Sequence, residues 1–306
     1  MSNTSNYLLS HQEKITSLKS SLEALAEKIK LKGDLPYTTV QEQLQILKEL
    51  SQFELGQFLI QHKGVNGYWT EYFLTFPWRP VRQKESLSKL ELFLLSASPI
   101  ILATQERFQV FLNENQKSVQ EGAQLASIPC GLLGEFLYLD YSNIRDITLL
   151  GIDLDASALE HAKELAAKKK LTSFVSLQQK DAWALHNNNQ FDLISSNGLT
   201  IYEPDDAKVV KLYKIFYDAL KSTGRLVTSF MTPPPDTAKD CEWIMSEINQ
   251  DALRKQKIIF SDILDVKFQC FRTSQQTRMQ LEEAGFKKIE FIYDAAHLFP
   301  TVIASK

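Results

Sequence analysis

The chain has 306 residues, 44% of them hydrophobic, and a formal net charge of −3. This length and apolar content suit one sizeable α/β domain with an appended region. The slightly acidic balance supplies no overall basic field, so we expect no nucleic acid among the partners.

The amino terminus predicts no targeting segment. Residues 1–6 are polar and lack the basic start and apolar run of a signal peptide. No stretch approaches the roughly 20 apolar residues of a membrane-spanning helix. The three cysteines, Cys130, Cys241 and Cys270, are far apart and in no metal-binding spacing. We therefore expect a cytoplasmic protein with reduced thiols and no membrane partner.

Residues 1–118 are predicted to form a helical N-terminal cap that recognises the substrate. Apolar residues recur at three- and four-residue spacing over 11–32 and over 39–62. A further helical pattern covers 90–111 and is interrupted near Pro99.

An aromatic stretch at 68–80 lies between these helices, with Arg79 and Arg82 at its end. It could line an apolar pocket with a cationic clamp for a carboxylate or phosphate. The alternative is a helical cap that buries these aromatic side chains against the sheet.

After about Glu121, short apolar runs alternate with helical segments, which predicts βαβ units and a parallel sheet. The expected strands are 123–129, 148–153, 174–179, 191–196, 224–230, 288–293 and 298–304. The expected helices are 134–141, 156–170, 205–220 and 274–284.

The last two strands are separated by only a few residues around 294–297. A parallel crossover needs a longer connection, so these strands must form an antiparallel hairpin. The prediction is a doubly wound α/β fold whose seven-stranded sheet is mostly parallel, with an antiparallel C-terminal hairpin and the N-terminal helical cap.

Ligands of such sheets lie beyond the carboxyl ends of the strands, so the loops there carry the candidate site. The first turn, 127–136, contains Gly131 and Gly134 before a predicted helix. Glycine allows close backbone approach, and helix-start N–H groups favour an anionic ligand group. After the second strand, Asp153 is placed to accept hydrogen bonds from ribose hydroxyls. Asp155 suits a helix N-cap.

Two further loops follow the third and fourth strands. The third is Gln179-Lys180-Asp181-Ala182-Trp183, and the fourth begins Phe191-Asp192-Leu193-Ile194 and runs through Asn197 and Gly198 to Tyr202. The acids Glu203, Asp205 and Asp206 allow a metal-assisted site, but Pro204 and these acids suit a helix start better, so no metal is expected.

From these loops in this order, residues 119–306 resemble a class I S-adenosylmethionine-dependent methyltransferase, a Rossmann-like fold, with an insertion at about 232–272. The family's acidic-x-Gly-x-Gly-x-Gly turn becomes Ser127-x-Pro129-x-Gly131-x-x-Gly134 here, without the acid and the first glycine. The resemblance implies that Asp181 and the N–H of the next residue bind adenine, and that Asn197 and Tyr202 face the methyl group or orient the acceptor.

The resemblance also implies S-adenosyl-L-methionine as the cofactor. The implied cofactor-binding residues are Pro129, Cys130, Gly131, Gly134, Asp153, Leu154, Asp181, Ala182, Trp183, Asn197 and Gly198.

Methyl transfer is an in-line displacement in which the protein supplies alignment, so no single catalytic residue is required. The expected acceptor is a small molecule, apolar or anionic, selected by the helical region and the insertion. His297 is a weak candidate base. Two alternatives stay open: an NAD-dependent oxidoreductase and a non-catalytic S-adenosylmethionine-binding protein.

Overall fold

The computed structural model describes residues 17–235, 237 and 241–306. It divides into two compact units. Within the described residues, the sheet unit comprises 106–235, 237, 241–243 and 269–306, and the helical unit comprises 17–105 and 244–268. The sequence predicted a domain boundary at residue 118, and the two units divide at residue 105, within a helix. The central part of the expected insertion, 244–268, belongs to the helical unit.

Several helices of the helical unit begin at polar N-caps, such as the Ser17 and Thr39 side chains that accept from backbone N–H groups of the first turn. The part of the first predicted helix at 11–16 lies outside the described residues. Within the described ranges, no helix is long and apolar enough to cross a membrane. The elements are α1 (Leu18–Lys32), α2 (Val40–Leu50), α3 (Glu54–His62), α4 (Gly67–Thr75), the 3-10 helix η1 (Phe76–Trp78), α5 (Val81–Glu85), α6 (Lys89–Ser96), the start of α7 (Pro99–Gln116), η4 (Met245–Glu247), α11 (Gln250–Lys257) and the π-helix η5 (Ile258–Ile263).

The single helical run expected at 39–62 is two helices, α2 and α3. At the start of α3, a Cβ on Gly56 would lie 2.0 Å from the Leu50 carbonyl oxygen, so only glycine permits this close packing.

The aromatic stretch contributes mainly to the core of the helical unit. Trp69, Phe73 and Phe76 are buried, whereas Tyr68 and Trp78 are exposed. The Arg79 guanidinium lies 3.8 Å from the centre of the Tyr72 ring. Burial of these rings does not agree with a pocket lined by the whole stretch, and their expected packing against the sheet stays a prediction.

The sheet unit contains the seven predicted strands, in the order β3-β2-β1-β4-β5-β7-β6. The first five strands pair in parallel, and β7 pairs antiparallel with both β5 and β6. The prediction of a mostly parallel seven-stranded sheet with an antiparallel C-terminal pair is therefore confirmed. The strands are β1 (Ala123–Ser127), β2 (Ile147–Asp153), β3 (Val175–Gln179), β4 (Phe191–Ser196), β5 (Leu220–Ser229), β6 (Lys288–Ile292) and β7 (Thr301–Ser305).

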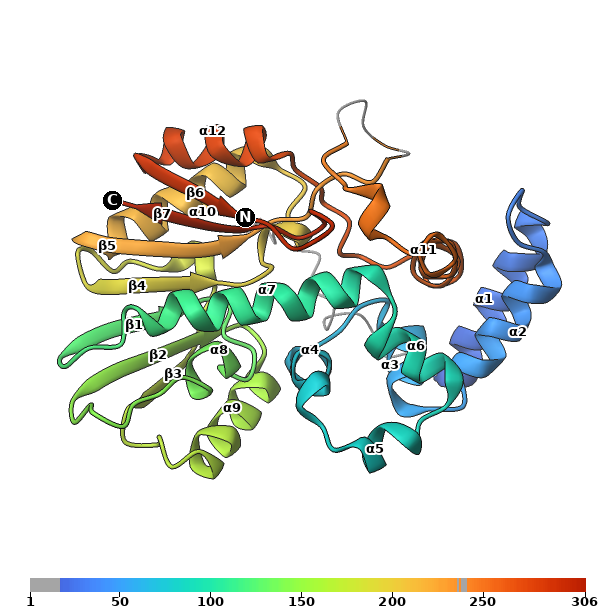
Figure 1. Cartoon of the computed structure of the whole chain (residues 1–306), viewed down its shortest axis with the longest axis horizontal. Coiled ribbons are helices and arrows are strands. Elements are labelled where there is room, and N and C mark those ends of the chain that lie inside the picture. Colours follow the sequence, from blue (N-terminus) through green and yellow to red (C-terminus); the bar gives the residue numbers. More distant parts are fainter. Residues whose placement is uncertain (1–16, 236, 238–240) are drawn as a thin grey trace, which may run out of the picture. The chain divides into compact units, whose positions relative to one another are not determined.

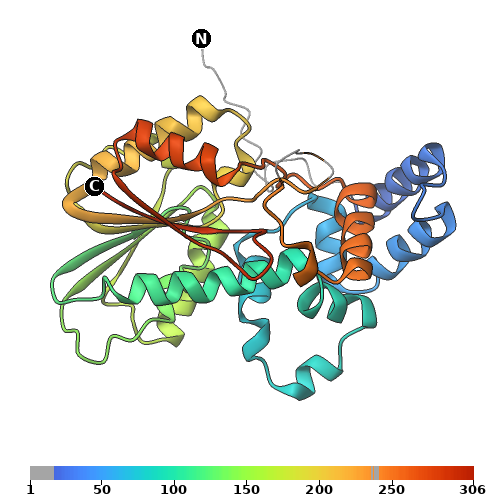
Figure 2. The same ribbon diagram turned by 45° about the horizontal axis from the view of Figure 1, so that its top comes forward.

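Helices cover both faces of this sheet (Figures 1 and 2). On one face, α10 and α12 pack with apolar residues of β1, β4, β5 and β7. On the other face, the end of α7 packs with α8 and α9. The helices of this unit are α8 (Gly134–Leu137), α9 (Ala156–Lys168), η2 (Ala182–Ala184), η3 (Thr200–Tyr202), α10 (Asp206–Ala219) and α12 (Ser274–Ala284).

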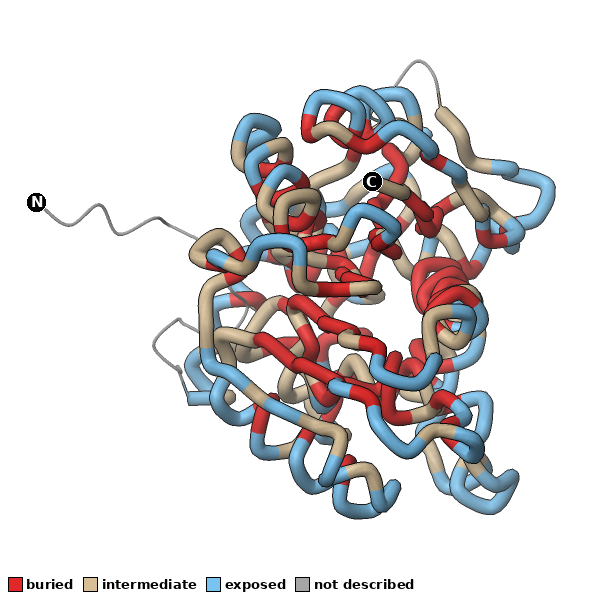
Figure 3. Tube along the Cα trace, turned by 90° about the vertical axis from the view of Figure 1, so that its left-hand side faces the viewer, coloured by how far each residue is buried: buried red, intermediate tan, exposed pale blue. Residues whose placement is uncertain are grey.

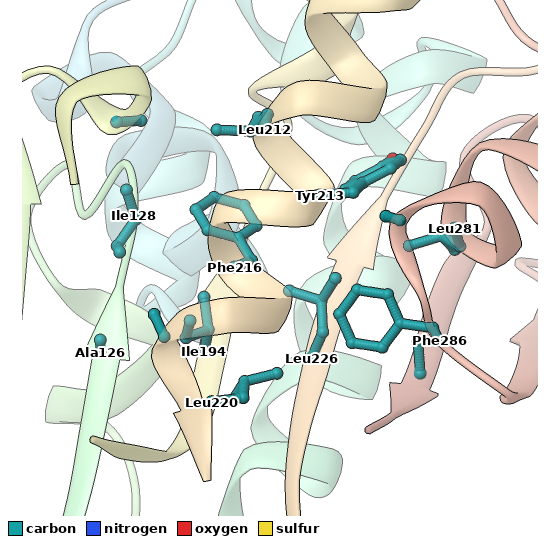
Figure 4. Packing of buried hydrophobic residues seen from close by; sticks show 14 of the residues in the cluster. Ala126, Ile128, Ile194, Leu212, Tyr213, Phe216, Leu220, Leu226, Leu281 and Phe286 are labelled. Carbon is teal, nitrogen blue, oxygen red and sulfur yellow. The ribbon is translucent and has the colours of Figure 1, made fainter. Parts of the chain in front are cut away.

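Neighbouring side chains of a strand point to opposite faces of the sheet, so each strand contributes to the hydrophobic core on both faces. Leu125 joins the core under α8 and α9, and Ala126 joins the core under α10. Figure 3 shows buried residues concentrated in the interior and exposed residues on outer turns. In Figure 4, the fully buried ring of Phe216 from α10 lies among cluster members that include Ile128 and Ile194.

We expect Phe216→Ala to lower the free energy of unfolding by ~3–5 kcal/mol, because it removes a buried ring and leaves a cavity. Urea denaturation of the purified protein measures this loss. Phe216→Leu keeps most of the apolar volume and should lose only about 1–2 kcal/mol. Equal losses for the two variants would contradict a well-packed site.

Candidate functional site

Parallel register brings the carboxyl ends of four strands to one edge of the sheet. Ser127 at the end of β1 pairs with Gly151 in β2 and with Ser195 in β4. Asp153 at the end of β2 pairs with Gln179 at the end of β3. The loops after β1, β2, β3 and β4 therefore leave the sheet at the same edge, where ligands of such sheets bind.

The turn after β1 is held by both neighbouring strands. The Ile128 N–H donates to the Ser195 carbonyl at 2.8 Å, and the Cys130 N–H donates to the Ile152 carbonyl at 2.9 Å. The Ile128–Pro129 peptide is cis. Burial raises the pKa of the Cys130 thiol, with Asp153 and Glu135 adding to the shift, so the thiol stays neutral.

Gly131 and Asp153 are brought into direct contact. Gly131 has a φ of +49°, which favours glycine, and its N–H donates to Asp153 Oδ2 at 2.9 Å. Asp153 Oδ1 accepts from the Asp155 N–H at 3.0 Å, while Asp155 caps α9. Asp153 thus joins the loops after β1 and β2. Leu154 is the residue between Asp153 and Asp155 in the sequence.

The helix after the turn is shorter than expected. α8 ends at Leu137 rather than near Tyr141, and it begins at the buried Gly134. A helix of a single turn has only a small dipole, so the start of α8 attracts an anionic ligand group weakly.

Asp181 begins the short helix η2, where its Oδ1 accepts from the Trp183 N–H at 2.9 Å. Ala182 is buried. The Trp183 indole N–H donates to the Lys208 carbonyl at 2.9 Å, and its ring packs against the core under α10. The Trp183 ring therefore contributes to the core, and its contact with the cofactor stays a prediction.

After β4, Gly198 has a φ of +76°, and its N–H donates to Ser229 Oγ at 3.1 Å. The Ser229 hydroxyl also lies 3.5 Å from Asn197 Oδ1. Tyr202 lies in η3, and burial raises its pKa to about 12. The phenol is thus protonated near neutral pH and can donate a hydrogen bond but cannot act as a base.

A buried carboxyl group, that of Glu135, lies at the same edge. Glu135 is 5% exposed, and its Oε1 accepts from the Ser127 hydroxyl at 2.5 Å. Among the described residues, its Oε2 has no hydrogen-bond partner. Burial raises the pKa of Glu135 to about 7, although Ser127, Ser195, Arg107 and Asn197 oppose the shift.

A buried cation, Arg107, accompanies it. Arg107 is 5% exposed, and its guanidinium lies 3.6 Å from the centre of the Phe299 ring. Burial lowers its pKa to about 9 against the attraction of Glu135, Asp294 and Tyr202. Within the described chain, its Nε and Nη1 have no hydrogen-bond partner.

The other acids near this edge have structural partners. Asp205 caps α10, and Asp206 accepts from Arg272 Nε at 2.8 Å. The Asp294 carboxylate accepts N–H groups of the turn before β7, including that of Phe299 at 2.6 Å. No cluster of three metal-ligating side chains occurs in the described ranges. The His297 ring stacks on Tyr293.

Arg107 and Glu135 were missed by sequence reasoning, although both leave a signal. Arg107 shares a helix face with Phe108, Phe111 and Asn115, all buried, so it is a charge at a core position. Glu135 is a charge within the apolar run 130–137. Both are exceptions to the apolar pattern of their own segments.

The folded protein should lose stability relative to Glu135→Gln as the pH rises from about 4.5 to about 7. The folded-state pKa of Glu135, about 7, lies above its ordinary value of 4.5. Its contribution is therefore complete below 4.5 and lost as the pH passes through 7, by up to roughly 3 kcal/mol. Urea denaturation of both proteins at about pH 5, 6, 7 and 8 measures this difference. If the difference in free energy of unfolding between the two proteins is the same at every pH, the raised pKa of Glu135 is contradicted.

Comparison with known families identifies the domain that contains these loops. A family model described as a methyltransferase domain matches residues 130–285, just over half of the chain. Its range includes the turn after β1 and the ends of β2, β3 and β4. The match favours methyl transfer over the NAD-dependent alternative. A search among curated proteins finds no match.

Solved structures share the fold. A protein from Bordetella parapertussis, described as a possible exported protein, is 41% identical, with coverage of 94% of this chain and 95% of that chain and a TM-score of 0.89. The S-adenosylmethionine-dependent methyltransferase SibL is 13% identical, with coverage of 95% and 76% and a TM-score of 0.51. A candidate O-methyltransferase from Nostoc punctiforme is 15% identical, with coverage of 78% and 70% and a TM-score of 0.50.

The last two likenesses concern the fold alone, whereas the family model spans Gly131, Asp153, Asp181 and Asn197 of the candidate site. The chain therefore belongs to the methyltransferase-domain family, and S-adenosylmethionine is its cofactor.

Proposed function

We propose that the protein transfers the methyl group of S-adenosylmethionine to a small-molecule acceptor. The observation that carries the proposal is the joined pair Gly131–Asp153, with Asp181 and Asn197 after the neighbouring strands, in a methyltransferase domain. The net charge of −3 offers no general attraction for nucleic acid.

The residues present fit this cofactor. The Asp153 carboxylate accepts the N–H groups of Gly131 and Asp155, and a carboxylate held in this way is the acceptor type that suits a ribose hydroxyl. Asp181 Oδ1 holds the Trp183 N–H, which orients the carboxyl group as an acceptor for the adenine amino group. Glu135 and Arg107 supply buried polar atoms that the fold leaves unpaired within the described residues.

The cofactor supplies a methyl group activated by the sulfonium, and the protein residues supply position and shielding from water. Gly198 lets the backbone after β4 turn with positive φ beside Asn197. The Asn197 amide and the protonated Tyr202 hydroxyl can donate hydrogen bonds that orient the acceptor. With a pKa of about 12, Tyr202 does not remove a proton from the acceptor.

We expect Asp153→Ala to weaken S-adenosylhomocysteine binding by about 1–3 kcal/mol, the cost of leaving polar partners unpaired. Isothermal titration calorimetry measures the change. Asp192→Asn is the matched control, because Asp192 lies at the amino end of β4 and pairs with Lys221. Unchanged affinity in Asp153→Ala would remove Asp153 from the site.

Labelled S-adenosylmethionine and a cell extract separated by size test the acceptor. We expect label in the small-molecule fraction and none in the protein or nucleic-acid fractions. Transfer to a macromolecule would contradict a small-molecule acceptor. Cofactor binding without transfer to any fraction would favour the non-catalytic alternative.

We also propose a cytoplasmic location. All three cysteines have free thiols, which suits a reducing compartment. Immunodetection in separated cell fractions tests this, and recovery of the protein outside the cytoplasm would contradict it.

A further inference from the structure

The sheet unit contains two buried arginines that differ in how fully the fold uses them. Arg272 is 3% exposed and donates to the carbonyls of Thr200 and Glu203 and to the Asp206 carboxylate. Arg107 is 5% exposed, yet its Nε and Nη1 have no partner among the described residues. Arg272 is fully occupied in holding loops together, so the unused donors of Arg107 are not a general property of buried arginines here.

The buried acids show the same contrast. Asp294 is 6% exposed and accepts from the N–H groups of Ala296, Leu298 and Phe299. Glu135 uses Oε1 for Ser127, while Oε2 lacks a partner in the described part of the chain. In the described part of the sheet unit, Arg107 and Glu135 thus keep unused hydrogen-bonding capacity.

These two groups attract each other but form no direct ion pair in the ranges described. Removing charges from water costs several kcal/mol for each ion unless partners replace the water. A direct ion pair between Arg107 and Glu135 would offset this desolvation cost. Their separation instead leaves each with buried polar atoms that the described chain does not pair.

Both groups lie at the β1 and β4 end of the site. Glu135 is bonded to Ser127, which ends β1, and has Ser195 and Asn197 of the β4 end beside it. Arg107 Nη1 is 3.8 Å from the position of a Cβ on Gly198. Asp153 and Asp181, which suit the ribose and adenine, follow β2 and β3 instead.

We propose that Glu135 and Arg107 form a receptor for the amino-acid part of S-adenosylmethionine: Glu135 Oε2 accepts from the α-ammonium group, and the Arg107 guanidinium donates to the α-carboxylate. The ligand then supplies one opposite charge to each unpaired group. The proposal rests on the proposed function, since it assigns one half of its cofactor. It also gives a physical role to Ser127, which connects the Glu135 carboxyl group to the strand end where the family pattern has an acid of its own.

Calorimetry with matched ligands tests the receptor. S-adenosylhomocysteine carries the whole amino-acid part, 5′-methylthioadenosine lacks it, and the decarboxylated and deaminated analogues of S-adenosylhomocysteine each lack one charged group. We expect Arg107→Met to weaken S-adenosylhomocysteine binding about 10- to 100-fold, the range for a hydrogen bond to a charged group, with methylthioadenosine affinity unchanged. It should not weaken binding of the decarboxylated analogue. Glu135→Gln should likewise weaken S-adenosylhomocysteine binding and leave methylthioadenosine affinity unchanged. It should not weaken binding of the deaminated analogue.

Arg225→Met is the control, because Arg225 is a partly buried arginine in the middle of β5 that pairs with Glu114. It should bind S-adenosylhomocysteine as the wild type does. The proposal is overturned if Arg107→Met weakens both nucleosides equally or neither. It is also overturned if the wild type binds the decarboxylated and deaminated analogues as tightly as S-adenosylhomocysteine, a measurement that needs no variant. A wild type that binds neither S-adenosylhomocysteine nor methylthioadenosine would instead contradict the proposed function.

Discussion

The site depends on the parallel pairing of β1 with β2 and β4. This register fixes the Ser127 backbone between Gly151 and Ser195, so the loops that follow leave the sheet together. The hydrogen bond from the Gly131 N–H to Asp153 then joins two of these loops. A register shift in one strand would reverse which side chains face each core and separate the polar groups at the edge. The chemistry is therefore set by backbone pairing before any side chain contributes.

Sequence periodicity predicted the sheet well, because strand and helix periods are local properties that burial enforces. The strand ends that carry Asp153, Asp181 and Asn197 were placed correctly. The length of α8 and the break between α2 and α3 were not, since tertiary packing decides both. Gly56, for example, meets the Leu50 carbonyl only in the folded unit. Which residues bind the cofactor remains a prediction.

Arg107 and Glu135 show why the rest of the site was harder to predict. They are 28 positions apart in sequence, and no fixed spacing connects a helix before β1 to a turn after it. Their importance comes from what they lack, a full set of partners, and only three-dimensional contacts reveal that. The sequence alone also does not explain why Ser127 stands where the family pattern has an acid. In the structure, the Ser127 hydroxyl donates a hydrogen bond to the Glu135 carboxyl group.

The ion pair between Asp262 and Lys32, at 2.8 Å, has a consequence for dissecting the protein. Asp262 also accepts from the Tyr37 hydroxyl, so the segment at 244–268 is tied to the first helices of the chain. The helical unit is thus discontinuous, built from two pieces of sequence with most of the sheet between them. A fragment that stops at residue 105 would be missing α11 and η5, and a sheet fragment that starts at 106 would carry them without their partners. Neither unit is one contiguous segment of the sequence, so no single cut in the chain separates them.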